Sequence, residues 1–362
     1  MDWARSLAII LALFSHVMIS TSGWSLLQVE HPDAYLVLRS FTRTATPMFI
    51  ILAGAAVELH YVRTWRADPA VGRARLLRQS LRCAIALFVI GVAAVIGGAM
   101  SVEDLLWSLV GVRAVPNAEI FVFYVVFFLL AVPLVAFRIK FGLVATLLLS
   151  SAWWVVAELV PAPPEGSPRL ALSRIFGFGD VYGPSVFHAI MLAVVGMVFA
   201  EAIRNRDAGS LVRRWGLFAG CVAAAALVVG VLIARHGLRP VLGAYVTAAE
   251  YRFTNHPGYY AIGLILTCAV LAVGFLVWRI RFRSRPLAAG PFGGDSLIAF
   301  TVGNAAINLA NPLFPTGSLS VAFASAAIVI LATWVFVVAL RRWRPKQRAP
   351  LEAGAETATP TR

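Results

Sequence analysis

Apolar and polar residues alternate along this chain in long blocks, without the short periods of a soluble fold. Crossing the hydrocarbon core of a bilayer takes about 20 helical residues, and ten apolar stretches approach that length. They lie near residues 6–22, 44–62, 83–100, 119–137, 141–160, 185–203, 215–234, 257–278, 294–312 and 319–340. The pattern predicts an all-α, polytopic integral membrane protein with about ten transmembrane helices, the ninth being short and polar.

The composition agrees with this class. The 362 residues are 60% hydrophobic and 13% charged, whereas a soluble domain carries about 25% charged residues. The first apolar stretch resembles a signal peptide, but no small-residue cleavage site follows it, so we expect it to remain as the first helix. The cysteines Cys83, Cys221 and Cys268 lie in apolar stretches without metal-ligand spacing, and we expect no metal site.

The positive charge is distributed as in membrane proteins. A net charge of +14 could indicate a nucleic-acid partner, but the basic residues come in short clusters between apolar spans, so we expect no nucleic-acid partner. With the N-terminus inside, 23 of the 31 Lys and Arg residues lie on the cytoplasmic side. This bias predicts a multi-pass protein of the cell inner (cytoplasmic) membrane with both termini cytoplasmic.

Two domains follow from this layout. Residues 1–345 form the membrane-embedded domain, and residues 346–362, rich in Pro, Ala and Thr, form a disordered cytoplasmic tail. An outer segment, 161–168, contains four prolines and predicts an extended loop. We find no internal repeat that would indicate a transporter built from two halves.

Arg5 and His16 form the first candidate for chemistry. They stand eleven residues apart, which corresponds to about three helical turns, so both side chains share one face of the first helix. The rise along the helix is about 16 Å, or about half the hydrocarbon core. If Arg5 lies at one membrane surface, His16 lies near the midplane, where an ionisable side chain usually marks a functional site. The alternative is a membrane anchor with one incidental histidine.

The residues Asp2-x-x-Arg5-x-Leu7-Ala8-Ile9, followed by His16, resemble the first helix of the acyltransferase-3-like membrane acyltransferases. These enzymes include the OpgC-like glucan succinyltransferases and the heparan-glucosaminide acetyltransferase-like members. The resemblance implies an O-acyltransferase that uses acyl-CoA as co-substrate, holds no bound cofactor, and acylates a glycan or glycolipid outside the cytoplasm. It also implies that His16 acts as the general base.

Two further stretches are similar to this family, each with a departure. The second span, 47–60, resembles its Phe-rich helix that ends in Ser-Gly, with Ala53 where relatives have serine. The ninth, 291–304, resembles its Gly-x-x-Ser-Leu-x-x-Tyr/Phe helix, with Gly303 where relatives often have a histidine, so that residue's role is not carried over. Glu58 and His60 end the second span, where function and interfacial snorkelling fit equally well.

The basic run between residues 73 and 82 is the candidate site for the acyl donor. Arg78 and Arg82 are four residues apart and share a helix face, as ligands of the phosphates of acyl-CoA must. We expect them, with Arg5, to bind the donor. For most arginines of this run the positive-inside rule and contact with anionic lipid are a sufficient explanation.

For the acceptor we name His188, Asn304 and Asn308. His188 lies inside an apolar run, and Asn304, Asn308 and Asn311 form one polar stripe on the ninth helix. Such a stripe binds substrate or forms hydrogen bonds between helices, and the pattern does not separate the two.

Together these observations predict transfer of an acetyl or succinyl group from cytoplasmic acyl-CoA to an extracytoplasmic hydroxyl. The partners are therefore acyl-CoA, a glycan or glycolipid acceptor, and the lipid bilayer. The alternative is a multi-span carrier or flippase for a glycan or lipid-linked substrate, in which His16 and the asparagine stripe line a permeation path.

Overall fold

The computed structural model describes residues 1–109, 111, 113–160, 170–178, 184–204, 211–281, 291–314 and 316–343, and this part of the chain contains helices and no strand. The first half comprises α1 (Asp2–Ser20), α2 (Gly23–Glu30), α3 (Pro32–Arg43), α4 (Ala45–Ala56), the π-helix η1 (Val57–Tyr61), α5 (Val62–Ala67), α6 (Pro69–Ile96), α7 (Val102–Leu109) and α8 (Glu119–Glu158). The second half comprises α9 (Leu170–Phe176), α10 (Val186–Arg204), α11 (Leu211–His236), α12 (Leu238–Val246), the π-helix η2 (Ala248–Arg252), α13 (Pro257–Arg281), α14 (Pro291–Gly294), α15 (Ser296–Ala310), the 3₁₀-helix η3 (Asn311–Leu313) and α16 (Leu319–Trp343). The loop predicted at 161–168 and the tail predicted at 346–362 lie outside the described residues.

The fold is all-α, as predicted, and suits a multi-pass membrane protein. Among the described residues, eight helices are long and apolar enough to cross a membrane. Large apolar side chains such as Leu227 on α11 and Leu331 on α16 are exposed, and a bilayer supplies the apolar contact that they lack. The helix α15, at 15 residues, is shorter than these eight.

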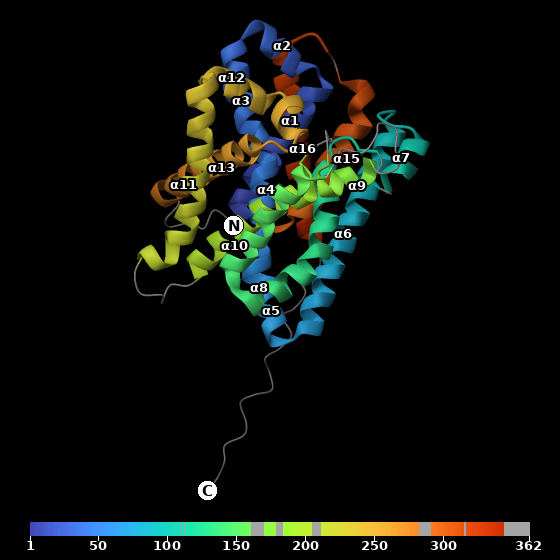
Figure 1. Ribbon diagram of the computed structural model, residues 1–362. Coiled ribbons are helices and arrows are strands. Elements are labelled where there is room, and N and C mark those ends of the chain that lie inside the picture. Colours follow the sequence, from blue (N-terminus) through green and yellow to red (C-terminus); the bar gives the residue numbers. More distant parts are fainter. Residues whose placement is uncertain are drawn as a thin grey trace, which may run out of the picture.

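The longest helix, α8, is a hairpin of two limbs (Figure 1). At Gly142 the backbone adopts φ 87° and ψ 174°, a conformation that glycine tolerates and other residues avoid. Before this point Arg138 reaches Glu201 near the end of α10, at 3.6 Å. After it, the ring of Trp154 lies 4.7 Å from that of His188 near the start of α10. The chain therefore reverses at Gly142, where the second of the two spans predicted near 119–137 and 141–160 begins.

Two boundaries differ from the prediction. The span predicted from residue 83 begins earlier, because Asp68 caps the helix by accepting hydrogen bonds from the backbone of Ala70 and Val71 at 2.8 and 3.1 Å. The basic run is therefore part of α6. The segment 23–43, which connects the first two predicted spans, is also helical and forms α2 and α3. Figure 1 shows α2 and α12 at one end of the bundle and α5 at the other.

The centre of the bundle is the contact between α4 and α10. A Cβ atom on Gly54 would lie 1.7 Å from the carbonyl oxygen of Ala193, and one on Gly196 would lie 2.0 Å from that of Ile51. The two backbones therefore touch, which is the way small residues stabilise helix pairs in membranes. Gly54, part of the motif that resembles the acyltransferases, is needed here for packing.

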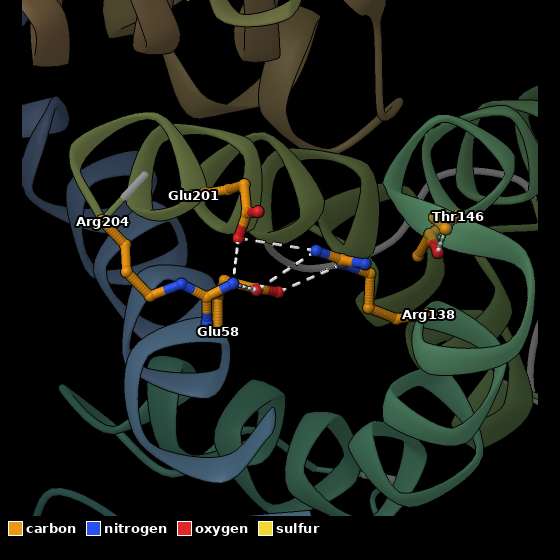
Figure 2. A network of polar contacts seen from close by, with 6 residues as sticks. Glu58, Arg138, Thr146, Glu201 and Arg204 are labelled. Atoms are coloured by element: carbon orange, nitrogen blue, oxygen red, sulfur yellow. Dashed lines mark hydrogen bonds and ion pairs between the residues drawn. The ribbon is translucent and has the colours of Figure 1, made fainter. Parts of the chain in front are cut away.

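A second tie between these helices is the ion network of Glu58, Arg138, Glu201 and Arg204 (Figure 2). The Glu58 carboxylate is fully buried and lies 3.2 Å from the guanidinium groups of both Arg138 and Arg204. Glu201 pairs with the same two arginines, so two acids balance two bases. Glu58 therefore joins η1, α8 and α10, and snorkelling does not describe it.

Candidate functional site

One cavity among the described residues, which we call the arginine cavity, has a volume of about 500 Å³, and a smaller one lies nearby. The arginine cavity lies between the start of α1, the end of α4 with η1 and α5, the first half of α6, and α8 and α15. Its basic lining residues are Arg5, His60, Arg75, Arg78 and Arg82. Deeper lining residues are aromatic or apolar: Phe49, Leu52, Tyr61, Phe121, Tyr124 and Phe128. A cationic mouth thus leads to an apolar interior.

The three residues predicted to bind the donor all line this arginine cavity. Arg78 and Arg82 are exposed on successive turns of α6, and Arg5 contributes from the first turn of α1. Arg5 lies 3.4 Å from Asp2, and Arg75 donates to the hydroxyl of Thr64 at 3.3 Å. No acidic side chain is among the cavity's lining residues, so the charges of Arg78 and Arg82 are available to an anion.

The smaller cavity, the histidine cavity, has a volume of about 170 Å³. It lies between the second half of α1, the start of α4, the start of α8 and the start of α10, toward the opposite ends of α1 and α4 from the arginine cavity. Its polar lining residues are Ser15, His16, Thr42, Arg43, Thr46, Arg113, Asn117, Glu119 and Arg252. Arg5 and His16 thus both face α4, α8 and α15, but they line different cavities.

Three side chains separate the two cavities. Phe49, Ile120 and Phe300 line both, and we call them the partition. The rings of Phe49 and Phe300 meet edge to face, with centroids 5.1 Å apart. Phe300 also lies 6.3 Å from the ring of His16. A group in the arginine cavity is therefore one layer of side chains away from the imidazole.

The His16 ring is held by Asn304 of α15. The amide nitrogen of Asn304 donates to the carbonyl oxygen of Phe300 at 2.8 Å, and this fixes the orientation of the amide. Its oxygen Oδ1 therefore faces His16 Nδ1, 2.6 Å away. Since Oδ1 can only accept, Nδ1 carries the proton, and in a neutral ring the lone pair is on Nε2. His16 is thus set in the tautomer that can accept a proton through Nε2.

The other two predicted acceptor residues lie elsewhere. Asn308 is buried and bonded on both sides of its amide: it accepts from Asn117 at 2.7 Å and donates to the carbonyl oxygen of Pro116 at 3.2 Å. His188 is buried, lies 2.7 Å from the Ser185 hydroxyl, and lines neither cavity. The Asn308 bonds tie α15 to the segment before α8, and the His188 contact lies at the first turn of α10.

Sequence reasoning missed two charged residues of the histidine cavity, Arg43 and Glu119. Arg43, Glu119 and Arg252 come together from three distant parts of the chain, and Glu119 pairs with Arg252. Burial works to lower the pKa of Arg252, but the Glu119 carboxylate together with Tyr259 and Tyr260 outweighs it, so this pKa is raised. One signal was available: Arg43 and Glu119 each stand at the edge of a predicted apolar span.

Within the described residues, no group of three or more His, Cys, Asp or Glu side chains is placed to hold a metal ion. No model of a known protein family matches the chain, and no curated protein matches it. The functional assignment therefore depends on the two cavities and the residues that line them.

Proposed function

We propose that this protein is a membrane O-acyltransferase that uses acyl-CoA. The observation that carries the proposal is the pair of cavities that meet at the partition, one lined by arginines and the other by His16. Arg5, Arg78 and Arg82 suit the phosphates of CoA, because guanidinium groups form charge-assisted, often bidentate, bonds with phosphate. The apolar interior behind them suits the acyl end of the donor.

In the proposed reaction the acceptor hydroxyl occupies the histidine cavity, and the thioester reaches it by passing Phe49 and Phe300. His16 Nε2 takes the hydroxyl proton while the oxygen attacks the thioester carbonyl. The carbon–sulfur bond breaks, the CoA thiolate leaves, and the imidazolium returns the proton to it. The products are an ester and free CoA, and no bound cofactor or metal takes part. The acyl group is acetyl or succinyl, and the acceptor is a glycan or glycolipid.

The orientation in the membrane is part of the proposal. We infer ten spans with both termini cytoplasmic in the inner membrane, counting the two limbs of α8 separately and including α15. The arginine cavity then opens to the cytoplasm, where acyl-CoA is made, and the histidine cavity faces outward. Reporter fusions after Arg66 and Arg344 are expected to report cytoplasm, and fusions after Arg113 and Arg239 the outside. Reversed results at two of these positions contradict the orientation.

The direct test uses the full-length chain purified in detergent. The protein is incubated with acetyl-CoA or succinyl-CoA and a mixture of bacterial envelope oligosaccharides, and both released thiol and acylated sugar are measured. Wild type is expected to form both products in equal amounts, and His16→Gln is expected to form neither above background. Absence of acyl transfer from folded wild type with both donors would remove the acyltransferase assignment.

A carrier is the second candidate, and the partition is the observation that favours it. Two cavities separated by one layer of side chains are also what a carrier closed at its centre requires. The thiol measurement separates the two, since a carrier moves its substrate without breaking the thioester. Uptake of labelled oligosaccharide into proteoliposomes with no release of CoA would support the carrier.

A further inference from the structure

Several arginines line the histidine cavity, although it lies at the end of the bundle that is predicted to face outward and to carry few basic residues. Under the predicted topology only eight of the 31 basic residues lie on the outer side. Three of the eight, Arg43, Arg113 and Arg252, line this one cavity. A fourth, Arg39, is buried behind it and donates to the hydroxyl of Ser15, itself a lining residue, at 2.7 Å. The positive-inside rule does not explain such a gathering.

The acidic residues nearby do not balance this charge. Glu119 is the one acid in the cavity lining, and it pairs with Arg252. Asp104 lies 3.3 Å from Arg113, and both side chains are exposed. Among the described residues Arg43 has no acidic partner, and its Nε donates to the carbonyl oxygen of Val246 at 3.2 Å. That bond fixes the side chain, and Glu119, the acid that acts on its charge, already pairs with Arg252.

An uncompensated guanidinium in a half-buried, partly apolar recess is costly, because burial removes the water that would solvate it. Arg43 is half-buried, and it shares the cavity with Ala45, Phe49 and Phe123. The Arg252 Nε is buried and has no hydrogen-bond partner within the described residues. An anion that enters the cavity would relieve the cost at Arg43 and would gain a charge-assisted hydrogen bond.

We infer that the histidine cavity binds the carboxylate or phosphate of a substrate, held by Arg43, beside the hydroxyl that His16 activates. The inference rests on the proposed function and deepens it, because it names the class of substrate as anionic. The volume of about 170 Å³ suits one substituted sugar unit or the end of an acyl group. The anion has two possible sources: the acceptor glycan or glycolipid, or the distal carboxylate of a dicarboxylic acyl group.

The first experiment measures binding alone and needs no acyl transfer. Glucuronate, glucose 6-phosphate and glucose are titrated into the purified full-length protein, and binding is followed by ligand-observed nuclear magnetic resonance. Wild type is expected to bind the two anions and not glucose. Arg43→Gln is expected to weaken anion binding about tenfold to a hundredfold, as loss of one charge-assisted contact does, and Arg43→Lys is expected to weaken it less.

Arg239→Gln is the matched control. Arg239 lies at the same end of the bundle, outside the cavity, and pairs with Asp33 at 3.1 Å. This variant is expected to bind the anions as wild type does. Glu119→Gln tests whether the cavity prefers negative charge, because removal of a carboxylate from the cavity is expected to maintain or strengthen anion binding. Equal binding of glucose and the anions, or equal loss in Arg43→Gln and Arg239→Gln, overturns the inference.

The second experiment identifies the source of the anion by acyl transfer. If the acceptor carries it, Arg43→Gln lowers transfer of acetyl groups to uronic oligosaccharides and not to neutral ones. If the acyl group carries it, the same variant lowers transfer from succinyl-CoA and not from acetyl-CoA. If anion binding depends on Arg43 but no acyl transfer is found, the anion site is supported and the proposed acyltransferase activity is contradicted. Transfer that is indifferent to Arg43 with every donor and acceptor overturns the inference and leaves the acyltransferase standing.

Discussion

The Glu58 network and the arginine cavity are adjacent, since η1 contributes Glu58 to one and His60 to the other, and they differ in how their charges are balanced. Glu58 points toward α8 and α10, where two acids and two bases satisfy one another. Two residues later His60 lines the arginine cavity, whose arginines face no acid in the lining. Both regions concentrate arginine, but the arginine cavity has an excess of positive charge in its lining, whereas the Glu58 network is balanced.

The difference teaches how to separate structural from functional charge in this bundle. A buried pair that is complete within the protein costs desolvation and fixes how helices meet. A cationic cluster that lines a cavity without acidic residues can instead hold an anion that enters from outside. The same distinction separates two histidines: His188 is buried against Ser185 and lines neither cavity, whereas His16 is held by Asn304 through one nitrogen and lines a cavity.

The largest effect, on the rate of acyl transfer, is expected at His16. His16→Gln removes the proton acceptor while it keeps the side chain's size, and the rate of acyl transfer is expected to fall about a hundredfold to ten-thousandfold. His188→Gln is the matched control: it is expected to lower the unfolding temperature and to retain turnover per folded molecule. Initial rates with saturating acyl-CoA, normalised to folded protein, measure both. Near-normal turnover in His16→Gln would make His16 structural and would break the comparison.

The Glu58 network is expected to give the next largest effect. Glu58→Gln leaves Arg138 and Arg204 with one acid between them, and loss of one partner from a buried ion pair costs about 3–5 kcal/mol in unfolding free energy. Unfolding in detergent with increasing denaturant measures this. The double variant Glu58→Gln with Arg204→Gln removes one charge of each sign and is expected to be more stable than Glu58→Gln alone. If the single variant unfolds like wild type, the network is not structural.

A smaller effect, and on a different quantity, is expected in the arginine cavity. Arg78→Gln and Arg82→Gln are each expected to weaken acyl-CoA binding by about 1.5–3 kcal/mol, or about tenfold to a hundredfold, because each loses a charge-assisted contact with phosphate. Arg5→Gln is expected to do the same to a lesser degree, since Asp2 already pairs with it. Stability should stay that of wild type, because exposed arginines contribute little to it. Arg73→Gln, on the same helix but outside the cavity lining, serves as the control.

Much of the architecture could be predicted from the apolar pattern, because membrane spans must be long and continuous. Even the reversal inside α8 was signalled, since Arg138 and Lys140 interrupt the apolar run next to Gly142. The early start of α6 was missed, although Asp68 followed by Pro69 is a helix-start signal. The basic run between residues 73 and 82 contains too few apolar residues for the hydropathy pattern to include it in a span.

The site itself could be predicted only as a set of candidates. Spacing along one helix placed Arg5 and His16 on a common side of α1, because helical geometry is local. The partner of His16 lies 288 residues away, and the residues of the partition come from three helices. Such pairings depend on how helices meet, which no periodicity encodes. For the same reason Asn304 and Asn308 looked alike in one stripe and turned out to have different surroundings.

The smallest effect is expected at Asn304, and it tests whether this side chain positions His16 or only fills space. Asn304→Leu removes the oxygen that accepts from Nδ1, so the ring can present either nitrogen to the cavity. One hydrogen bond contributes about 0.5–1.5 kcal/mol, and kcat is therefore expected to fall about twofold to tenfold with an unchanged KM for acyl-CoA. Asn304→Asp retains an acceptor oxygen at the same place and is expected to be closer to wild type. Asn308→Leu, four residues along the same stripe, is expected to lose stability and to keep its kcat per folded molecule. An equal loss of kcat in both leucine variants would show that the stripe acts through packing alone, and Asn304 would then belong with His188 on the structural side of the comparison.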